Sequence, residues 1–152
     1  MTFRSHMHTA LAEARSAAGR GETPVGAVIV DPARGLVLAQ AGNRTRELHD
    51  PTAHAEILAL RAACASVGSE RLPGVDVYVT LEPCPMCAAA LAAARVARIY
   101  YAAADPKSGG IEQGPCIFEH PQAHHRPEVY GGLQEAAAAA LLRDFFKQRR
   151  GG

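Results

Sequence analysis

The sequence VDVYVTLEPCPMC, residues 75–87, joins a strand pattern to the start of a helix. Val75–Thr80 is rich in β-branched residues and predicts a buried strand. Two prolines then flank Cys84, and an alanine-rich segment continues to about Ala94. Proline suits the first turn of a helix and alanine its interior. The stretch therefore predicts a strand followed by a helix whose N-terminus carries Cys84 and Cys87.

The rest of the chain alternates strands and helices in the same way. Its patterns predict further strands over about 25–30, 36–39 and 96–101, and helices over about 3–18, 52–66 and 134–148. We expect the first two strands to form a hairpin of two buried strands. Asp50-Pro51 is expected to supply the N-cap and first residue of the 52–66 helix. This alternation predicts the α/β class, with a central sheet covered by helices on both faces.

Composition sets limits on the kind of protein. The chain has 152 residues, 48% of them hydrophobic, and 16 Lys+Arg balance 15 Asp+Glu. These values are typical of one packed domain, here 1–152, and argue against a disordered chain or a disulfide scaffold. Neither a signal peptide nor a membrane span is predicted, so a cytoplasmic location is expected. There cysteines stay reduced, and paired ones are first considered as metal ligands or catalysts.

Three residues have the chemistry and spacing of zinc ligands. His54 precedes the pair Cys84 and Cys87 by thirty residues, whereas Cys64 and Cys116 are isolated. A structural zinc site would need a fourth protein ligand, but three ligands leave one position for water. The pattern favours one catalytic zinc ion per chain. The alternatives are a structural zinc knot, or a reduced C-x-x-C with an unrelated histidine.

Glu56 lies two residues after His54. Residues i and i+2 point to different sides of a helix, so these two can face one point only near a helix end. Cys84 and Cys87 also lie at a predicted helix N-terminus, where unpaired N–H groups and the helix dipole favour thiolates. We therefore expect two helix N-termini to face one pocket, with Glu56 as an acid/base rather than a ligand.

The combination H-x-E and P-C-x-x-C is the pattern of the zinc deaminases. The chain resembles the bacterial tRNA-specific adenosine deaminases (TadA family) over nearly its whole length, except between about Ser108 and Pro127. The segments that carry the resemblance are Gly21–Val28, Gly42-Asn43, Asp50–Ile57, Val79–Cys87, Asp105–Lys107 and Phe145–Arg150. It implies the three-layer α/β/α cytidine-deaminase-like fold, with a central mixed sheet of about five strands.

The resemblance also implies roles for single residues. His54, Cys84 and Cys87 would hold Zn²⁺, and Glu56 would move protons. The substrate would be met by Asn43, Ala55, Asp105, Lys107, Phe146, Arg149 and Arg150. The implied reaction converts adenosine to inosine at the wobble position of a tRNA-Arg anticodon loop, by a homodimer without a membrane or a nucleotide cofactor.

Several features also have simpler interpretations. Asn43, after Gly42, could be only a turn residue in the left-handed conformation, and Asp105, before Pro106, is a common first residue of a turn. The basic residues from Arg143 onward are typical of a solvated helix end, although against a net charge of +1 they also form a local basic patch. His124 and His125 could line a substrate groove or lie elsewhere on the surface. The alternative functions are a deaminase of a free base or nucleoside, such as guanine, cytosine or cytidine, and a zinc-stabilised RNA-binding subunit.

Overall fold

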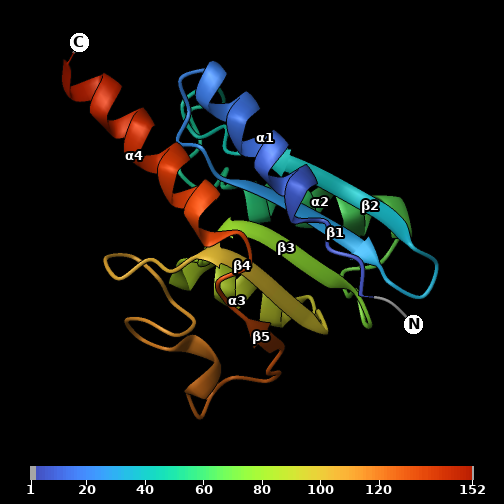
Figure 1. The fold of residues 1–152 in the computed structure, drawn as a ribbon. Helices are drawn as coiled ribbons and strands as arrows, with labels where there is room; N and C mark the ends of the chain where they lie inside the picture. Colours follow the sequence, from blue (N-terminus) through green and yellow to red (C-terminus); the bar gives the residue numbers. More distant parts are fainter. Residues whose placement is uncertain (1–2, 152) are drawn as a thin grey trace.

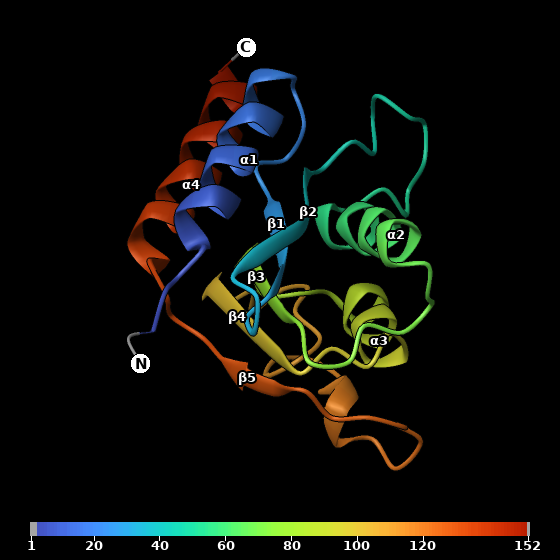
Figure 2. The ribbon, with the colours of Figure 1, turned by 90° about the vertical axis from the view of Figure 1, so that its right-hand side faces the viewer.

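The protein forms three layers, with a five-stranded sheet between two pairs of helices (Figure 1). The structure is a computed structural model that describes residues 3–151, and side chains as far as residue 149. Helices α1 and α4 cover one face of the sheet, and α2 and α3 cover the other (Figure 2). The elements in chain order are α1 (Met7–Gly19), β1 (Gly26–Asp31), β2 (Leu36–Gly42), α2 (Ala55–Val67), β3 (Asp76–Leu81), α3 (Pro85–Ala93), β4 (Arg98–Ala103), the 3-10 turn η1 (Ile117–Glu119), β5 (Glu128–Tyr130) and α4 (Glu135–Gly151). This confirms the predicted three-layer α/β/α fold.

The sheet is mixed, as expected, with the strand order β2-β1-β3-β4-β5. Strand β1 pairs antiparallel with both β2 and β3. Strand β3 pairs in parallel with β4, and β4 in parallel with β5. A parallel connection needs a crossover, and α3 provides the one between β3 and β4. The turn between β3 and α3 therefore lies at the carboxyl edge of the sheet, where ligands bind in open α/β sheets.

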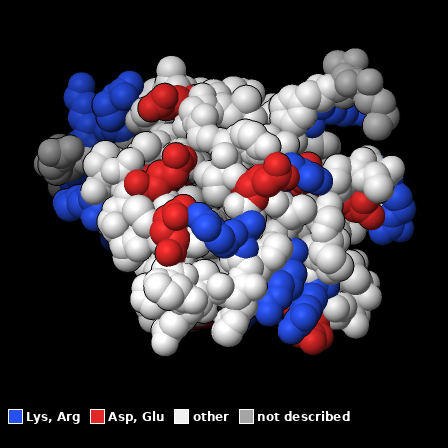
Figure 3. Space-filling model, turned by 90° about the horizontal axis from the view of Figure 1, so that it is seen from below, with Lys and Arg blue, Asp and Glu red and all other residues white. Residues whose placement is uncertain are grey.

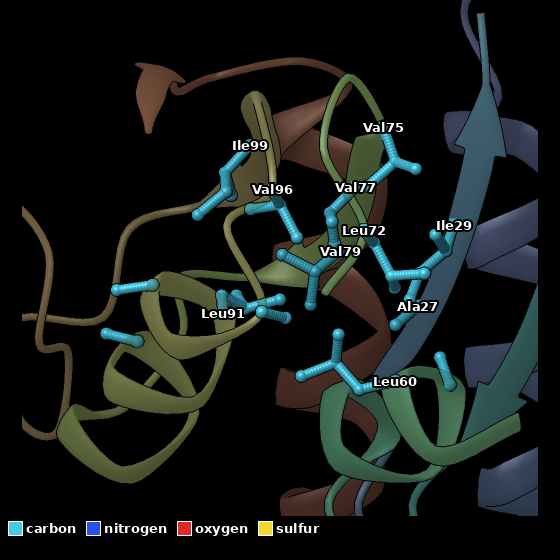
Figure 4. Close-up of a cluster of buried hydrophobic side chains, with 14 of the residues drawn as sticks. Ala27, Ile29, Leu60, Leu72, Val75, Val77, Val79, Leu91, Val96 and Ile99 are labelled. Atoms are coloured by element: carbon cyan, nitrogen blue, oxygen red, sulfur yellow. The ribbon is translucent and has the colours of Figure 1, made fainter. Parts of the chain in front are cut away.

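The main core lies between the sheet and helices α2 and α3. Figure 4 shows aliphatic side chains from three strands meeting Leu60 of α2 and Leu91 of α3. Ile29, Val77 and Ile99 come from neighbouring strands and are fully buried. The β-branched runs seen in the sequence thus form the centre of the sheet, because each strand there is covered on both sides.

Helix α1 lies unusually close to the hairpin. A Cβ at Gly26 would lie 2.0 Å from the Ala10 carbonyl oxygen, so only glycine fits where β1 passes under the helix. The buried stripe of α1, from Met7 to Ala17, faces this strand. Helix α4 packs beside α1, and its alanine run, residues 136–140, includes the buried Ala138.

Two local expectations were wrong. The hairpin does not consist of two buried strands, because β2 is an edge strand whose Leu36 and Val37 are exposed. Helix α2 begins at Ala55, not near Thr52, and its N-cap is His54. The Asp50 carboxylate instead accepts hydrogen bonds from the backbone and hydroxyl of Thr52, within a turn that precedes the helix.

The surface charges are intermixed over much of the molecule. On the face seen in Figure 3, acidic and basic side chains lie next to one another. None of the helices in residues 3–151 is both long and apolar enough to cross a membrane.

Candidate metal centre and active site

Two of the three expected metal ligands are helix N-caps. His54 occupies the N-cap position of α2 and Cys84 that of α3, and both have extended backbone conformations. Pro85 occupies the first turn of α3, where its lack of an N–H costs nothing. Cys87 follows one turn later and is fully buried. The two helix starts lie on the same face of the sheet (Figure 2), so the ligands converge as expected from the sequence.

The three ligand atoms have the spacing of a tetrahedral zinc site. His54 Nδ1 lies 3.7 Å from Cys84 Sγ and 3.5 Å from Cys87 Sγ. Zinc bonds of about 2.3 Å to sulfur and about 2.0 Å to nitrogen place tetrahedral ligands about 3.5 Å apart. All three ligand atoms lie within 4.8 Å of one another, and this is the one such His, Cys or acid cluster in the described part of the chain. The donor set therefore fits one zinc ion.

The electrostatics of the site favour a thiolate at Cys84. The hydrogen bond from Cys87 lowers the pKa of Cys84 to about 4, with a further contribution from His54. The same bond and burial raise the pKa of Cys87. The hydrogen bond with Cys84 raises the pKa of His54. Neighbouring groups thus already favour a negative sulfur, which is the form that binds metals.

Glu56 lies in the first turn of α2 and is 4% exposed. It is absent from the ligand cluster but lines the same cavity as His54 and Cys84. Burial raises the pKa of Glu56 to about 7, and the charge of His54 opposes this rise. A carboxyl group with a pKa near neutrality can take up and release a proton with similar ease. This is the property expected of a general acid/base.

A cavity of about 240 Å³ opens at these residues. Asn43 lines it and is 9% exposed. Its Oδ1 accepts a hydrogen bond of 2.8 Å from the Ala55 N–H. Asn43 does not have a positive φ, so the interpretation as a left-handed turn residue was wrong. The asparagine instead faces the site and caps the helix that carries Glu56.

A larger groove of about 820 Å³ adjoins this cavity. Four of the residues expected to meet the substrate line it: Asp105, Lys107, Phe146 and Arg149. Thr23, Leu81, Asp105 and Ser108 line both spaces, so the groove leads directly to the metal centre. Phe146 is 45% exposed, whereas the adjacent Phe145 is 9% exposed. Phe146 is thus the exposed ring of this adjacent pair, although both rings line the groove.

Other residues expected to meet the substrate are not among the described residues that line the cavity or the groove, and one of those that do also forms a turn. Ala55 is fully buried and is not among the residues lining the cavity. Arg150 belongs to α4, but its side chain is outside the described residues. His124 lines a separate cavity beside α3, and His125 contacts the Val96 carbonyl, so neither is among the residues lining the groove. Asp105 is also a turn residue, because its Oδ1 accepts from the Lys107 N–H.

The sequence did not indicate three residues that shape the groove. Arg46 lines it from the loop between β2 and α2. Glu22 is 1% exposed and accepts hydrogen bonds from the backbone of Arg46 and Glu47, which holds that loop. Glu82 accepts hydrogen bonds from the backbone of Asp105 and Glu112 in the same manner, and so holds the segment after β4. A buried carboxylate that binds distant backbone has no local sequence signal, although an acid inside an apolar segment is a hint.

Fold and site together define a zinc-dependent hydrolytic deaminase that acts on a carbon–nitrogen bond. The chain belongs to the cytidine and deoxycytidylate deaminase zinc-binding family, whose pattern matches residues 2–103. It is 56% identical to the tRNA-specific adenosine deaminase of Agrobacterium fabrum, over 99% of this chain and 98% of that protein.

Solved structures of deaminases share this fold. A tRNA:A34 deaminase, described for A-to-I editing at the wobble position of transfer RNA, superposes with a TM-score of 0.88 and is 56% identical. The superposition covers 91% of this chain and 100% of that one. A guanine deaminase from Nitrosomonas europaea is 25% identical, with a TM-score of 0.81 over 95% of this chain and 86% of that one.

Proposed function

We propose that residues 1–152 form a single deaminase domain that converts adenosine to inosine at the wobble position of tRNA, in the anticodon loop of tRNA-Arg. The observation that carries this proposal is the 820 Å³ groove that adjoins the metal centre. A free base would fill only the small cavity. A base that enters from a polynucleotide needs an adjoining surface for its neighbours, since deaminases act on unstacked nucleotides.

The groove has the chemistry of a single-stranded RNA site. Lys107, Arg149 and Arg46 lie along it, and each can pair with phosphate. The exposed ring of Phe146 offers a stacking surface for a base. Substrate contacts by Asn43, Ala55, Asp105 and Arg150 are part of the same proposal. A basic groove beside one pocket suits a compact loop better than a long duplex.

The residues of the site suit hydrolytic deamination. His54, Cys84 and Cys87 would hold zinc, which when bound activates water for attack on the carbon that bears the amino group. Glu56 is buried beside these ligands and would receive the proton of that water. It would deliver this proton to the ring nitrogen, then take the second proton from the added hydroxyl oxygen and pass it to the amine, which leaves as ammonia. Asn43 has its Oδ1 engaged by Ala55, so its amide N–H groups are the donors left for the target base.

The likeness to guanine deaminase supports one alternative, the deamination of a free base. To separate the two, the protein is incubated with an anticodon stem-loop carrying adenosine at the wobble position, and separately with free guanine and cytosine. We expect inosine in the RNA and no ammonia from the bases. Ammonia released from a free base, with unchanged RNA, would replace the proposal by the alternative. A stem-loop with guanosine at the wobble position is the matched control.

A homodimer and a cytoplasmic location complete the proposal. Both are supported by the family resemblance, and the location also by the four cysteines, none of which forms a disulfide. Light scattering of the zinc-loaded protein at micromolar concentration should give twice the mass of one chain. A mass of one chain would remove the dimer from the proposal.

A further inference from the structure

Glu82 connects the metal site to the wall of the groove. It lies between β3 and the ligand Cys84, and it is 2% exposed. Its carboxylate accepts hydrogen bonds from four backbone N–H groups of the segment after β4. These donors are Asp105 at 3.0 Å, Ile111 at 3.2 Å, Glu112 at 2.8 Å and Gln113 at 3.0 Å.

The segment 105–113 depends on such an acceptor. It contains no helix or strand, so its N–H groups have no regular backbone partners. Lys107 and the Asp105 side chain, both on this segment, line the groove. Hydrogen bonds to a charged acceptor are stronger than those between neutral groups. The carboxylate of Glu82 therefore accepts hydrogen bonds from backbone N–H groups of this segment, as the carbonyl groups of a neighbouring strand do inside a sheet.

Close packing joins the same segment to the metal ligands. The Gly110 N–H donates to the Pro83 carbonyl at 2.8 Å. A Cβ at Gly110 would lie 2.5 Å from the Pro85 nitrogen, and one at Gly109 would lie 2.6 Å from the Asp105 carbonyl oxygen and 2.7 Å from Cδ of Glu82. The loop thus lies directly against the turn that carries Cys84, with no room for a side chain between them.

We propose that Glu82 is a positioning residue that sets the place of the 105–113 segment, and so of the groove wall, relative to the metal ligand Cys84. Only one residue, Pro83, separates Glu82 from this ligand along the chain, so the groove and the metal centre are held as one unit. This inference rests on the proposed function, because it takes the groove as the surface that binds the RNA.

The variant Glu82→Gln tests this role with little change in size. Glutamine replaces one acceptor oxygen by an NH₂ donor, which would face backbone N–H groups. We expect amide hydrogen exchange at 105 and 111–113 to become about tenfold faster or more. The KM for the stem-loop should rise about tenfold, with a much smaller change in kcat and with zinc still near one per chain. Glu119→Gln is the matched control, because that exposed carboxylate pairs with Arg126 within the same connection.

A second variant perturbs the contact from the other side. Gly109→Ala leaves Glu82 in place but displaces the segment, because its Cβ would press against both the Asp105 carbonyl oxygen and the Glu82 carboxylate. It should give the same faster exchange and raised KM, and it also serves if Glu82→Gln does not fold. Unchanged exchange, or loss of zinc and kcat at an unchanged KM, would overturn the role of Glu82. If the wild-type protein does not act on RNA, the proposed function fails, and hydrogen exchange alone then decides whether Glu82 holds the segment.

Discussion

The Oδ1 atom of Asn43 accepts a hydrogen bond of 2.8 Å from the backbone N–H of Ala55. Ala55 is the first residue of α2 and lies between His54 and Glu56. The N–H groups at a helix start have no partner within the helix, and here a side chain twelve residues upstream supplies one. The residue proposed to bind the target base therefore also fixes the helix end that carries a metal ligand and the acid/base.

Because Asn43 has these two roles, two substitutions of it should have different effects. Asn43→Asp keeps the oxygen that caps α2 but loses the amide donors, so it should fold normally and lose kcat/KM. Asn43→Ala loses both functions and should also lower the free energy of unfolding by about 1 kcal/mol. Urea unfolding and deamination assays measure the two effects. Equal stability of the two variants would show that the bond to Ala55 contributes little.

Glu56→Gln should separate chemistry from metal binding. The variant keeps the shape of the side chain but cannot take up a proton, so we expect kcat to fall by about 10²–10⁴-fold. Zinc content should stay near one per chain, because Glu56 is outside the ligand cluster. Metal analysis and single-turnover assays test this. Glu70→Gln, at an exposed position beyond the end of α2, is the control. Activity equal to the wild type would remove Glu56 from the mechanism.

Cys87→Ala should lose zinc and stability together. Only two ligands would remain, and the energy of metal binding also stabilises the folded state. Cys64→Ala is the matched control, because Cys64 packs against the core but is not a ligand. Thermal unfolding with and without a chelator measures the difference. A chelator that lowers the Tm of Cys87→Ala as much as that of Cys64→Ala would contradict the assignment.

Glu22 should make stability depend on pH in the acid range. Burial alone would raise its pKa, but hydrogen bonds from the Glu47 and Arg46 backbone and from Thr45 outweigh it, and the pKa is lowered from 4.5. A lowered pKa gives stability that is full above the unfolded value and lost as pH falls through the folded value. Wild type should exceed Glu22→Gln by about 2 kcal/mol at neutral pH, a gap that narrows below about pH 4.5. Urea unfolding across pH tests this, and a gap independent of pH would refute it.

The adjacent rings of α4 should behave differently. Phe146→Ala removes an exposed ring from the groove, so it should raise the KM for the stem-loop about tenfold and leave stability nearly unchanged. Phe145 also lines the groove but is buried, so Phe145→Ala should in addition cost about 3 kcal/mol of unfolding free energy. Steady-state kinetics and urea unfolding distinguish the two. A KM for Phe146→Ala equal to that of the wild type would exclude stacking on this ring.

Much of the site could be predicted because its signals are local. His54, Cys84 and Cys87 are residue types with few other reasons to occur at helix starts, and proline and alanine mark those starts. The prediction of the N-cap at Asp50 was wrong because its local signal was ambiguous. Asp-Pro suits both a helix start and a turn; here Asp50 holds a turn with Thr52, and the helix begins at Ala55, whose N–H donates to the distant Asn43 side chain.

The sequence by itself determined the alternation of strands and helices, and it indicated the proposed metal ligands and the proposed acid/base, since each depends on the spacing of neighbouring residues. The tertiary structure decided what depends on contacts between distant segments. Glu22 binds the loop that carries Arg46 to the groove, and Glu82 binds the 105–113 segment. A buried carboxylate finds its partners by three-dimensional proximity. The walls of the groove are thus set by long-range hydrogen bonds, which no local pattern encodes.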